Sequence, residues 1–152
     1  MKKKLMVIAS CALLLFAAGC KKDGQNAPDS FIGNVASPTW TVPEAYDYTS
    51  SMTAVVKVDL KAQYPGKAAD WQLNDNDILA AFSGDNCVGT SSPVEGLFFL
   101  TIVDAEKNIT LRYYSAQYKN FFEARDVFPF HNDDHLGTIA EPLVPTFVVV
   151  KQ

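Results

Sequence analysis

The stretch MTAVVKVDL at residues 52–60 decides the fold class of this chain. Apolar side chains stand at every second position from Met52 to Leu60, with Thr53, Lys57 and Asp59 among the residues between them. Successive side chains of a β-strand point to opposite faces. In a helix, each side chain is rotated by about 100° from the one before it, so that the same face returns every 3.6 residues. The alternation therefore predicts a strand that buries one face and exposes the other.

The chain on either side of this strand consists of similar short runs separated by turn residues. SGDN at residues 83–86 is typical of a turn, so the runs that flank it are expected to form a hairpin. Residues 104–108 are expected to join the next two runs as a second hairpin. In the long connection at residues 61–76, either a helical turn or a functional loop is expected. Further strands are predicted at residues 78–82, 87–90, 97–103, 109–114, 121–124 and 146–150.

This pattern predicts an all-β protein with a single antiparallel β-sandwich, of jelly-roll or immunoglobulin-like type, because no long segment after residue 20 carries a helical stripe. Cys87 is the one cysteine inside the expected domain, so no internal disulfide can form and packing must stabilise the fold. The phenylalanines assigned to the core are Phe82, Phe98, Phe99, Phe128, Phe130 and Phe147.

The N-terminal residues have the features of an export signal. Lys2, Lys3 and Lys4 precede an apolar run at residues 5–18. A helix of that length reaches about 21 Å, short of the roughly 30 Å hydrocarbon core, which favours a signal peptide over residues 1–19 rather than a membrane span. The run ends in AAGC, which resembles the lipobox of bacterial lipoproteins. The resemblance implies a lipid on Cys20; the alternative is an ordinary signal peptide followed by a chance cysteine.

The residues after Cys20 suggest where the protein is anchored. Lys21 stands where an aspartate often retains lipoproteins in the inner membrane, so the resemblance implies the outer membrane, and the charged Lys21-Lys22-Asp23 resembles the tags of surface-exposed lipoproteins. Residues 20–38 are small and polar and are expected to form the lipidated N-terminus and a flexible linker. The β-sandwich domain is expected at residues 39–152.

The charge of the chain bears on its partners. It has 13 basic and 17 acidic residues, and removal of the three N-terminal lysines would take the net charge from −4 to about −7. Proteins that bind nucleic acid carry basic patches that neutralise phosphates. No nucleic-acid partner is therefore expected, and the membrane, through the lipid anchor, is the partner that the sequence indicates.

Four motifs follow one another in the first half of the expected domain: YDY at residues 46–48, SMT at 51–53, NDILAAF at 76–82 and DNCVG at 85–89. Together they resemble a β-domain of extracellular proteins and lipoproteins from Bacteroidota-type bacteria, and the likeness covers about residues 40–150. The family pattern is roughly Y-x-Y-S-M-T followed by D-D-x-L-A-A-F-x-G-D-E-C-R-G, and Val88 stands where its arginine is usual. The family has no established activity, so the resemblance implies a fold and a location but no catalytic residue.

Two sets of residues could carry metal or nucleophile chemistry. His131 and His135 could hold zinc if a helix placed them on one face, but Pro129 and Gly137 nearby favour a loop. Cys87 could act as a nucleophile beside either histidine, with Asp133 or Asp134 orienting it; the alternative is a buried structural cysteine.

The segment NDND at residues 74–77 offers oxygen ligands of the kind that calcium prefers, so Asp75 and Asp77 are a possible calcium site. The spacing does not match an EF-hand, and such residues before a strand usually form turns. No other cofactor is expected.

Aromatic residues near predicted strand ends suggest ligand binding, because exposed rings can stack on sugars; the alternative is that they cap the core. A non-catalytic binding or scaffold module for a glycan or an envelope protein is the first hypothesis. A small hydrolase that uses Cys87 or the His131–His135 loop is the second, and a purely structural subunit of an envelope complex is the third. The aromatic candidates are Trp71 and Tyr118, followed by Trp40, Tyr64 and Phe121.

Overall fold

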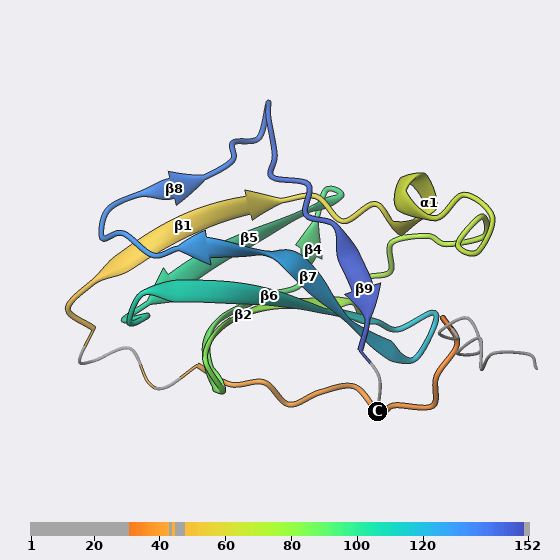
Figure 1. Ribbon diagram of the computed structural model, residues 1–152, viewed down its shortest axis with the longest axis horizontal. Coiled ribbons are helices and arrows are strands. Elements are labelled where there is room, and N and C mark those ends of the chain that lie inside the picture. The colour runs from red at the N-terminus through yellow and green to blue at the C-terminus, as the bar shows by residue number, and fades with distance from the viewer. Residues whose placement is uncertain (1–30, 43, 45–47, 151–152) are drawn as a thin grey trace, which may run out of the picture.

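A computed structural model describes residues 31–42, 44 and 48–150 and contains two packed β-sheets. The four-stranded sheet has the order β4-β5-β1-β8, and the five-stranded sheet has the order β3-β2-β6-β7-β9 (Figure 1). The strands are β1 (Ser51–Val56), β2 (Ile78–Ser83), β3 (Asn86–Ser91), β4 (Pro93–Val94), β5 (Leu97–Val103), β6 (Asn108–Ser115), β7 (Asn120–Pro129), β8 (His135–Leu136) and β9 (Phe147–Val149), and the helix is α1 (Leu60–Gln63).

The predicted all-β sandwich is confirmed. Strand pairs within both sheets are antiparallel, apart from the short parallel pair of β1 and β8, in which Thr53 lies opposite His135. The alternation that begins at Met52 is seen directly, since Met52, Ala54 and Val56 of β1 are buried between the sheets. The predicted hairpin around residues 83–86 is also present, as β2 and β3.

Aromatic rings form the centre of the core. Tyr113 lies 6.1 Å from Phe98, 5.9 Å from Phe122 and 5.8 Å from Phe147, measured between ring centroids. Such tilted and edge-on contacts are the favourable arrangements for aromatic pairs. The confirmed core phenylalanines are therefore Phe98 and Phe147, which are fully buried.

The other phenylalanines depart from the prediction to different degrees. Phe99 is 40% exposed, because Phe98 faces the core and the next residue of a strand must face outward. Phe128 and Phe130 are only partly buried against the core. Phe82 is buried, but it packs against Trp40 at a ring distance of 5.5 Å rather than in the central cluster.

The prediction that residues 104–108 close a hairpin is wrong. β5 pairs with β1 and β4, whereas β6 pairs with β2 and β7, so the connection crosses from one sheet to the other. The crossing begins at Asp104, whose φ of 45° turns the chain out of the first sheet. A hairpin loop within one sheet and a connection between two sheets can be equally short and polar. Only the pairing partners of the two flanking strands distinguish these alternatives.

The structure also corrects the predicted linker, since residues 31–38 pack on the domain instead of extending from it. Phe31 is 9% exposed and joins the core cluster, and the backbone N–H groups of Gly33 and Val35 donate to the carbonyls of Tyr118 and Lys119 at 2.8 and 2.9 Å. Residues 31–42, which we name the N-terminal strap, run beneath the five-stranded sheet in Figure 1. The predicted signal peptide and Cys20 lie outside the described residues.

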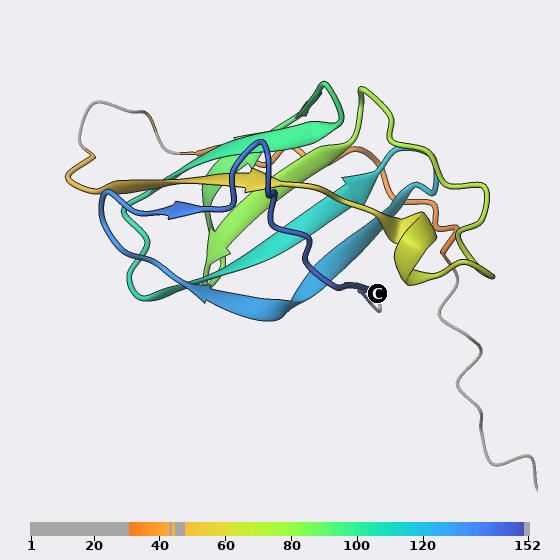
Figure 2. The ribbon, with the colours of Figure 1, turned by 90° about the horizontal axis from the view of Figure 1, so that it is seen from above.

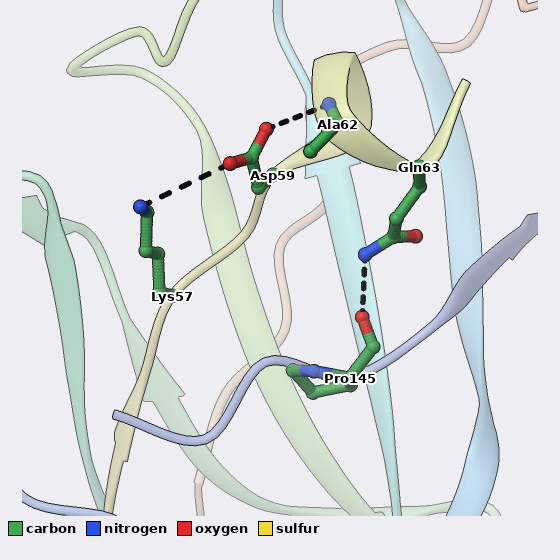
Figure 3. A network of polar contacts seen from close by, with 5 residues as sticks. All are labelled: Lys57, Asp59, Ala62, Gln63 and Pro145. Carbon is green, nitrogen blue, oxygen red and sulfur yellow. Dashed lines mark hydrogen bonds and ion pairs between the residues drawn. The ribbon is translucent and has the colours of Figure 1, made fainter. Parts of the chain in front are cut away.

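The long connection after β1 contains the expected helical turn, α1. Its N-cap Asp59 accepts a hydrogen bond from the Ala62 N–H at 2.9 Å and lies 3.9 Å from the Lys57 ammonium. Gln63 ties the helix to the chain before β9, because its side-chain amide donates to the Pro145 carbonyl at 2.7 Å (Figure 3). In the described part of the chain, no helix is long and apolar enough to cross a membrane.

Gly89 of β3 allows the two sheets to approach each other at one corner. A Cβ atom at this position would lie 2.7 Å from the backbone oxygen of Thr101 in β5, and backbone cannot move as a flexible side chain can. We expect Gly89→Ala to lower the free energy of unfolding by about 2 kcal/mol, measured by urea denaturation. Gly66→Ala is the matched control, because its Cβ would meet no atom within 4 Å, and an equal loss in both variants would contradict the prediction.

Candidate functional site

The sandwich has two distinct ends, which Figures 1 and 2 show at opposite sides of the molecule. At one, which we name the loop end, lie residues 48–50, 84–85, 104–107 and 130–134. Glu44 lies there too, close to Asp104 and Glu106. At the other, the helix end, lie α1, the loop after it and the β6–β7 turn at residues 116–119. Phe31 packs at the helix end, in ring contact with Tyr64 and Tyr118.

The loop end contains a cleft of about 460 Å³. Tyr48, which is half-buried, contributes an aromatic ring, and Val88 and Val103 contribute apolar surface. Hydroxyl, amide and carboxylate groups supply the polar part of the wall. The described residues that line this loop-end cleft are Glu44, Tyr48, Ser83, Asn86, Cys87, Val88, Val103, Asp104 and Glu106.

Asp104 organises the rim of the cleft. Its Oδ1 atom accepts hydrogen bonds from the backbone N–H and the hydroxyl of Ser50, both at 2.8 Å, and from the backbone N–H of Thr49 at 3.1 Å. The Ser50 hydroxyl is the main cause that holds the pKa of this carboxyl below its usual range. Because Oδ2 accepts only a longer contact of 3.4 Å from Thr49, it keeps capacity for a further donor.

The same rim offers more hydrogen-bonding groups. The Ser83 Oγ atom accepts the Glu106 backbone N–H at 3.2 Å, which leaves the hydroxyl proton of Ser83 available as a donor. The Asn86 side-chain amide can donate and accept, and Asn86 is exposed. A ligand in the cleft would therefore meet both donors and acceptors beside an aromatic ring.

The charge around the cleft is one-sided. Among the described residues that line it, none carries a basic side chain. An anionic ligand would be repelled by this surface, whereas a neutral polar ligand would not. The described acidic residues of the loop end are Glu44, Asp85, Asp104, Glu106, Asp133 and Asp134, against Lys107 as the basic one.

Cys87 lines the cleft, but the described residues around it do not give its thiol the surroundings of a nucleophile. Its Sγ atom lies 3.7 Å from the Gly89 carbonyl, to which the thiol donates, and burial raises the pKa of the thiol. Activated cysteines have a lowered pKa and a neighbouring base. Neither His131 nor His135 is among the described residues that line the cleft.

The histidine segment is not a helix, as Pro129 and Gly137 indicated: residues 132–133 form a turn and His135 begins β8. The Asp134 N–H donates to the His131 carbonyl at 3.2 Å, and Asp133 has a φ of 62°. The backbone of this segment pairs with the edge of β1, since the Thr53 N–H donates to the Asp134 carbonyl at 3.0 Å. Over the described residues, no group of three or more His, Cys, Asp and Glu side chains lies close enough to hold a metal ion.

The structure contradicts Asp77 as a calcium ligand, because its carboxylate is fully buried and engaged by donors of the protein. It accepts hydrogen bonds from the Tyr113 hydroxyl at 2.5 Å, the Ala116 N–H at 2.8 Å and the Asn74 N–H at 3.0 Å. These bonds fasten the loop before β2 to the end of β6. Asp75 stays exposed at the turn, so the segment serves as the turn former that its composition also suggested.

Trp71 and Tyr118 are buried, not exposed, so they cannot stack on a ligand at the surface. The Trp71 Nε1–H donates to the Tyr113 hydroxyl at 3.2 Å. The Tyr118 hydroxyl donates to Asp70 at 2.9 Å, and burial together with that carboxylate raises the pKa of Tyr118 to about 12. The alternative, that these aromatics cap the core, is the one that the structure supports.

The remaining aromatic candidates are half-buried and also serve packing. The Tyr64 hydroxyl donates to the Phe147 carbonyl at 2.6 Å, and Trp40 of the N-terminal strap packs on Phe121 at a ring distance of 5.3 Å. None of the five predicted aromatics is among the described residues of the cleft. The aromatic that lines it is Tyr48, which the sequence suggests only as part of the family-like motif. Its position three residues before β1 is the signal that places it at a sheet end.

Comparisons with protein-family models, with curated proteins and with solved structures found no match to this chain. The residues of the loop-end cleft and the N-terminal sequence are therefore the features of this chain that bear on its function.

Proposed function

We propose that this protein is a lipid-anchored lipoprotein of the outer membrane and a non-catalytic binding module whose loop-end cleft holds a neutral, hydroxyl-rich glycan. The observation that carries the proposal is the wall of the cleft, where the Tyr48 ring lies beside hydrogen-bonding groups and no basic side chain of the described residues is present. Sugars offer apolar ring faces and many hydroxyls, which match these two kinds of surface.

The chemistry of the rim supports a sugar in particular. A sugar hydroxyl can donate to the Asp104 Oδ2 atom, which keeps capacity for a donor, while the Asn86 amide and the Ser83 hydroxyl can serve as donors to ring or hydroxyl oxygens. Hydrogen bonds to an ionised group are stronger than those between neutral groups, and Asp104, whose pKa lies below its ordinary value of 3.8, is ionised at neutral pH.

The membrane anchor in this proposal rests on the sequence. The basic residues 2–4, the apolar run at 5–18 and AAGC with Cys20 support export and lipidation, and Lys21 favours the outer membrane. Two or more acyl chains hold a protein on a membrane stably, whereas one chain binds only marginally. Mass spectrometry of the protein purified from membranes tests this part, since an unmodified Cys20 would contradict it.

Binding without catalysis is the better-supported use of the cleft. The raised pKa of the Cys87 thiol and the lack of a histidine among the described lining residues both work against a nucleophile there. A hydrolase that used Cys87 as its nucleophile would lose its turnover when the thiol is replaced by a serine hydroxyl. We expect ligand binding to persist in the Cys87→Ser variant, because the substitution changes the size of this wall residue only slightly.

Tyr48→Ala is expected to weaken glycan binding about tenfold, because the variant loses the aromatic surface of the cleft. The measurement is the melting temperature of residues 21–152 against a panel of neutral and acidic oligosaccharides. A ligand at about a hundred times its dissociation constant stabilises the native state by roughly 2.7 kcal/mol, which gives a readable shift.

Phe99→Ala is the matched control for this prediction, because Phe99 is a partly exposed aromatic of the four-stranded sheet and does not line the cleft. It should leave the ligand-induced shift unchanged. A flat response of the unaltered protein to every neutral glycan, or an equal loss in both variants, would contradict the proposed site.

A further inference from the structure

We propose that the anchored protein stands on the lipid surface with its helix end toward the membrane and its loop end, with the cleft, directed outward. The membrane surface is the partner of the helix end. This inference rests on the lipid anchor in the proposed function. It adds the orientation, which follows from the place where the chain joins the domain and from the distribution of charge.

The N-terminal strap fixes the point at which the chain enters the domain. Phe31 packs against Tyr64, Tyr118 and Phe122 at ring distances of 5.0, 5.9 and 5.6 Å. The Asn120 side-chain amide also donates to the Phe31 carbonyl at 3.3 Å. Tyr64 and Tyr118 lie in the loops of the helix end, and Asn120 and Phe122 lie in the part of β7 next to it, so a lipid on Cys20 would hold the domain by this end.

The length of chain between Cys20 and Phe31 limits the other orientations that the anchored domain could take. Eleven peptide steps separate Cys20 from Phe31, and a fully extended chain covers about 3.3–3.6 Å per residue, so the two residues can lie at most about 40 Å apart. The ten residues of β7, which runs from the helix end to the loop end, rise about 33 Å. To place the loop end on the lipid surface, the chain would have to extend almost completely along the side of the domain.

The charges favour the same orientation. The loop end has six described acidic residues against Lys107, whereas exposed lysines balance the acidic residues at the helix end. An anionic headgroup surface therefore repels the loop end and tolerates the helix end. The exposed charges at the helix end are Lys61, Lys67 and Lys119 against Asp70 and Asp75.

One apolar side chain adds to this surface. Ile32 is 71% exposed and follows Phe31 directly, so it lies where the chain would approach the lipid. An apolar side chain gains free energy when it enters the boundary between headgroups and acyl chains. Ile32 is therefore expected to contact lipid in the anchored protein.

The test uses the full-length, lipidated protein in vesicles of phosphatidylethanolamine and phosphatidylglycerol that contain a nitroxide-headgroup lipid. In a Cys87→Ser background, a fluorophore is attached through Lys61→Cys at the helix end or through Asp85→Cys at the loop end, both of which are exposed positions. The nitroxide is expected to quench the label at position 61 several-fold more strongly than the label at position 85. Equal quenching, or stronger quenching at position 85, would overturn the orientation.

Separate controls distinguish failure of the orientation from failure of the proposed function. Flotation with the vesicles reports the anchor, and a chain that does not float overturns the orientation together with the lipidation. Glycan binding is measured on the unaltered lipidated protein, and its absence leaves the quenching result intact. Lys67→Cys provides a second helix-end label and is expected to behave like Lys61→Cys, so quenching at the level of Asp85→Cys would also overturn the proposal.

Discussion

Asp77→Ala is expected to lower the free energy of unfolding by about 4 kcal/mol at neutral pH, as measured by urea denaturation. The substitution removes the acceptor for three donors: the Tyr113 hydroxyl and the N–H groups of Ala116 and Asn74. The buried Tyr113 hydroxyl costs about 1–3 kcal/mol when it is left without an acceptor, and the part-buried N–H groups of Ala116 and Asn74 add smaller losses. The loss of the carboxylate's own burial cost offsets part of this sum.

Asp77→Asn is the control that separates charge from shape. Burial raises the pKa of Asp77 above its ordinary value of 3.8, so the folded protein binds a proton here that the unfolded chain releases. The stability of the unaltered protein relative to Asp77→Asn should be greatest below pH 3.8 and should fall as the pH rises through the folded-state pKa. A difference that grows with pH would contradict this account of the site.

Phe31→Ala is expected to lower the free energy of unfolding by about 3 kcal/mol, because the variant leaves a cavity among the rings of Tyr64, Tyr118 and Phe122. Ile32→Ala is the adjacent control. Its side chain is mostly exposed, so a change below about 0.5 kcal/mol is expected. Denaturation of residues 21–152 and of both variants provides the comparison.

The pair of variants distinguishes a packed strap from a linker. If residues 31–38 were a linker, neither variant would change stability, and equal small effects would therefore contradict the packing of Phe31. If the strap is part of the cooperative unit, Phe31→Ala should also change the fluorescence of Trp40, which packs on Phe82 and Phe121 farther along the same segment.

The positions of most strands could be predicted from the sequence, but the strands that pair with each other in a sheet could not. The alternation in β1 and the turn at residues 83–86 are local signals, and both appear in the structure as predicted. The connection at residues 104–107 is also a local feature, but whether it returns to the same sheet depends on the strands that β5 and β6 find elsewhere. Local composition contains no information on that choice.

The residues of the candidate site also depend on contacts that local sequence does not predict. Trp71 and Tyr118 were plausible ligand contacts because they lie outside the predicted strands, yet the loop before β2 folds back on β6 and buries both. Tyr48 and Asp104 are 56 positions apart in the chain and meet at one cleft. Their proximity results from the return of β5 beside β1, in which Ser51 lies opposite Val103.

The sequence by itself determined the all-β class, the inward face of β1 and the turns, because these depend on side-chain periodicity and turn chemistry over a few residues. Its N-terminal motif also supplied the prediction of a lipid anchor. Only the tertiary structure decided that Phe31 belongs to the core, that Asp77 is an internal acceptor and that Tyr48 lines a cleft. Each of these depends on contacts between residues distant in the chain, which form only when the two sheets pack together.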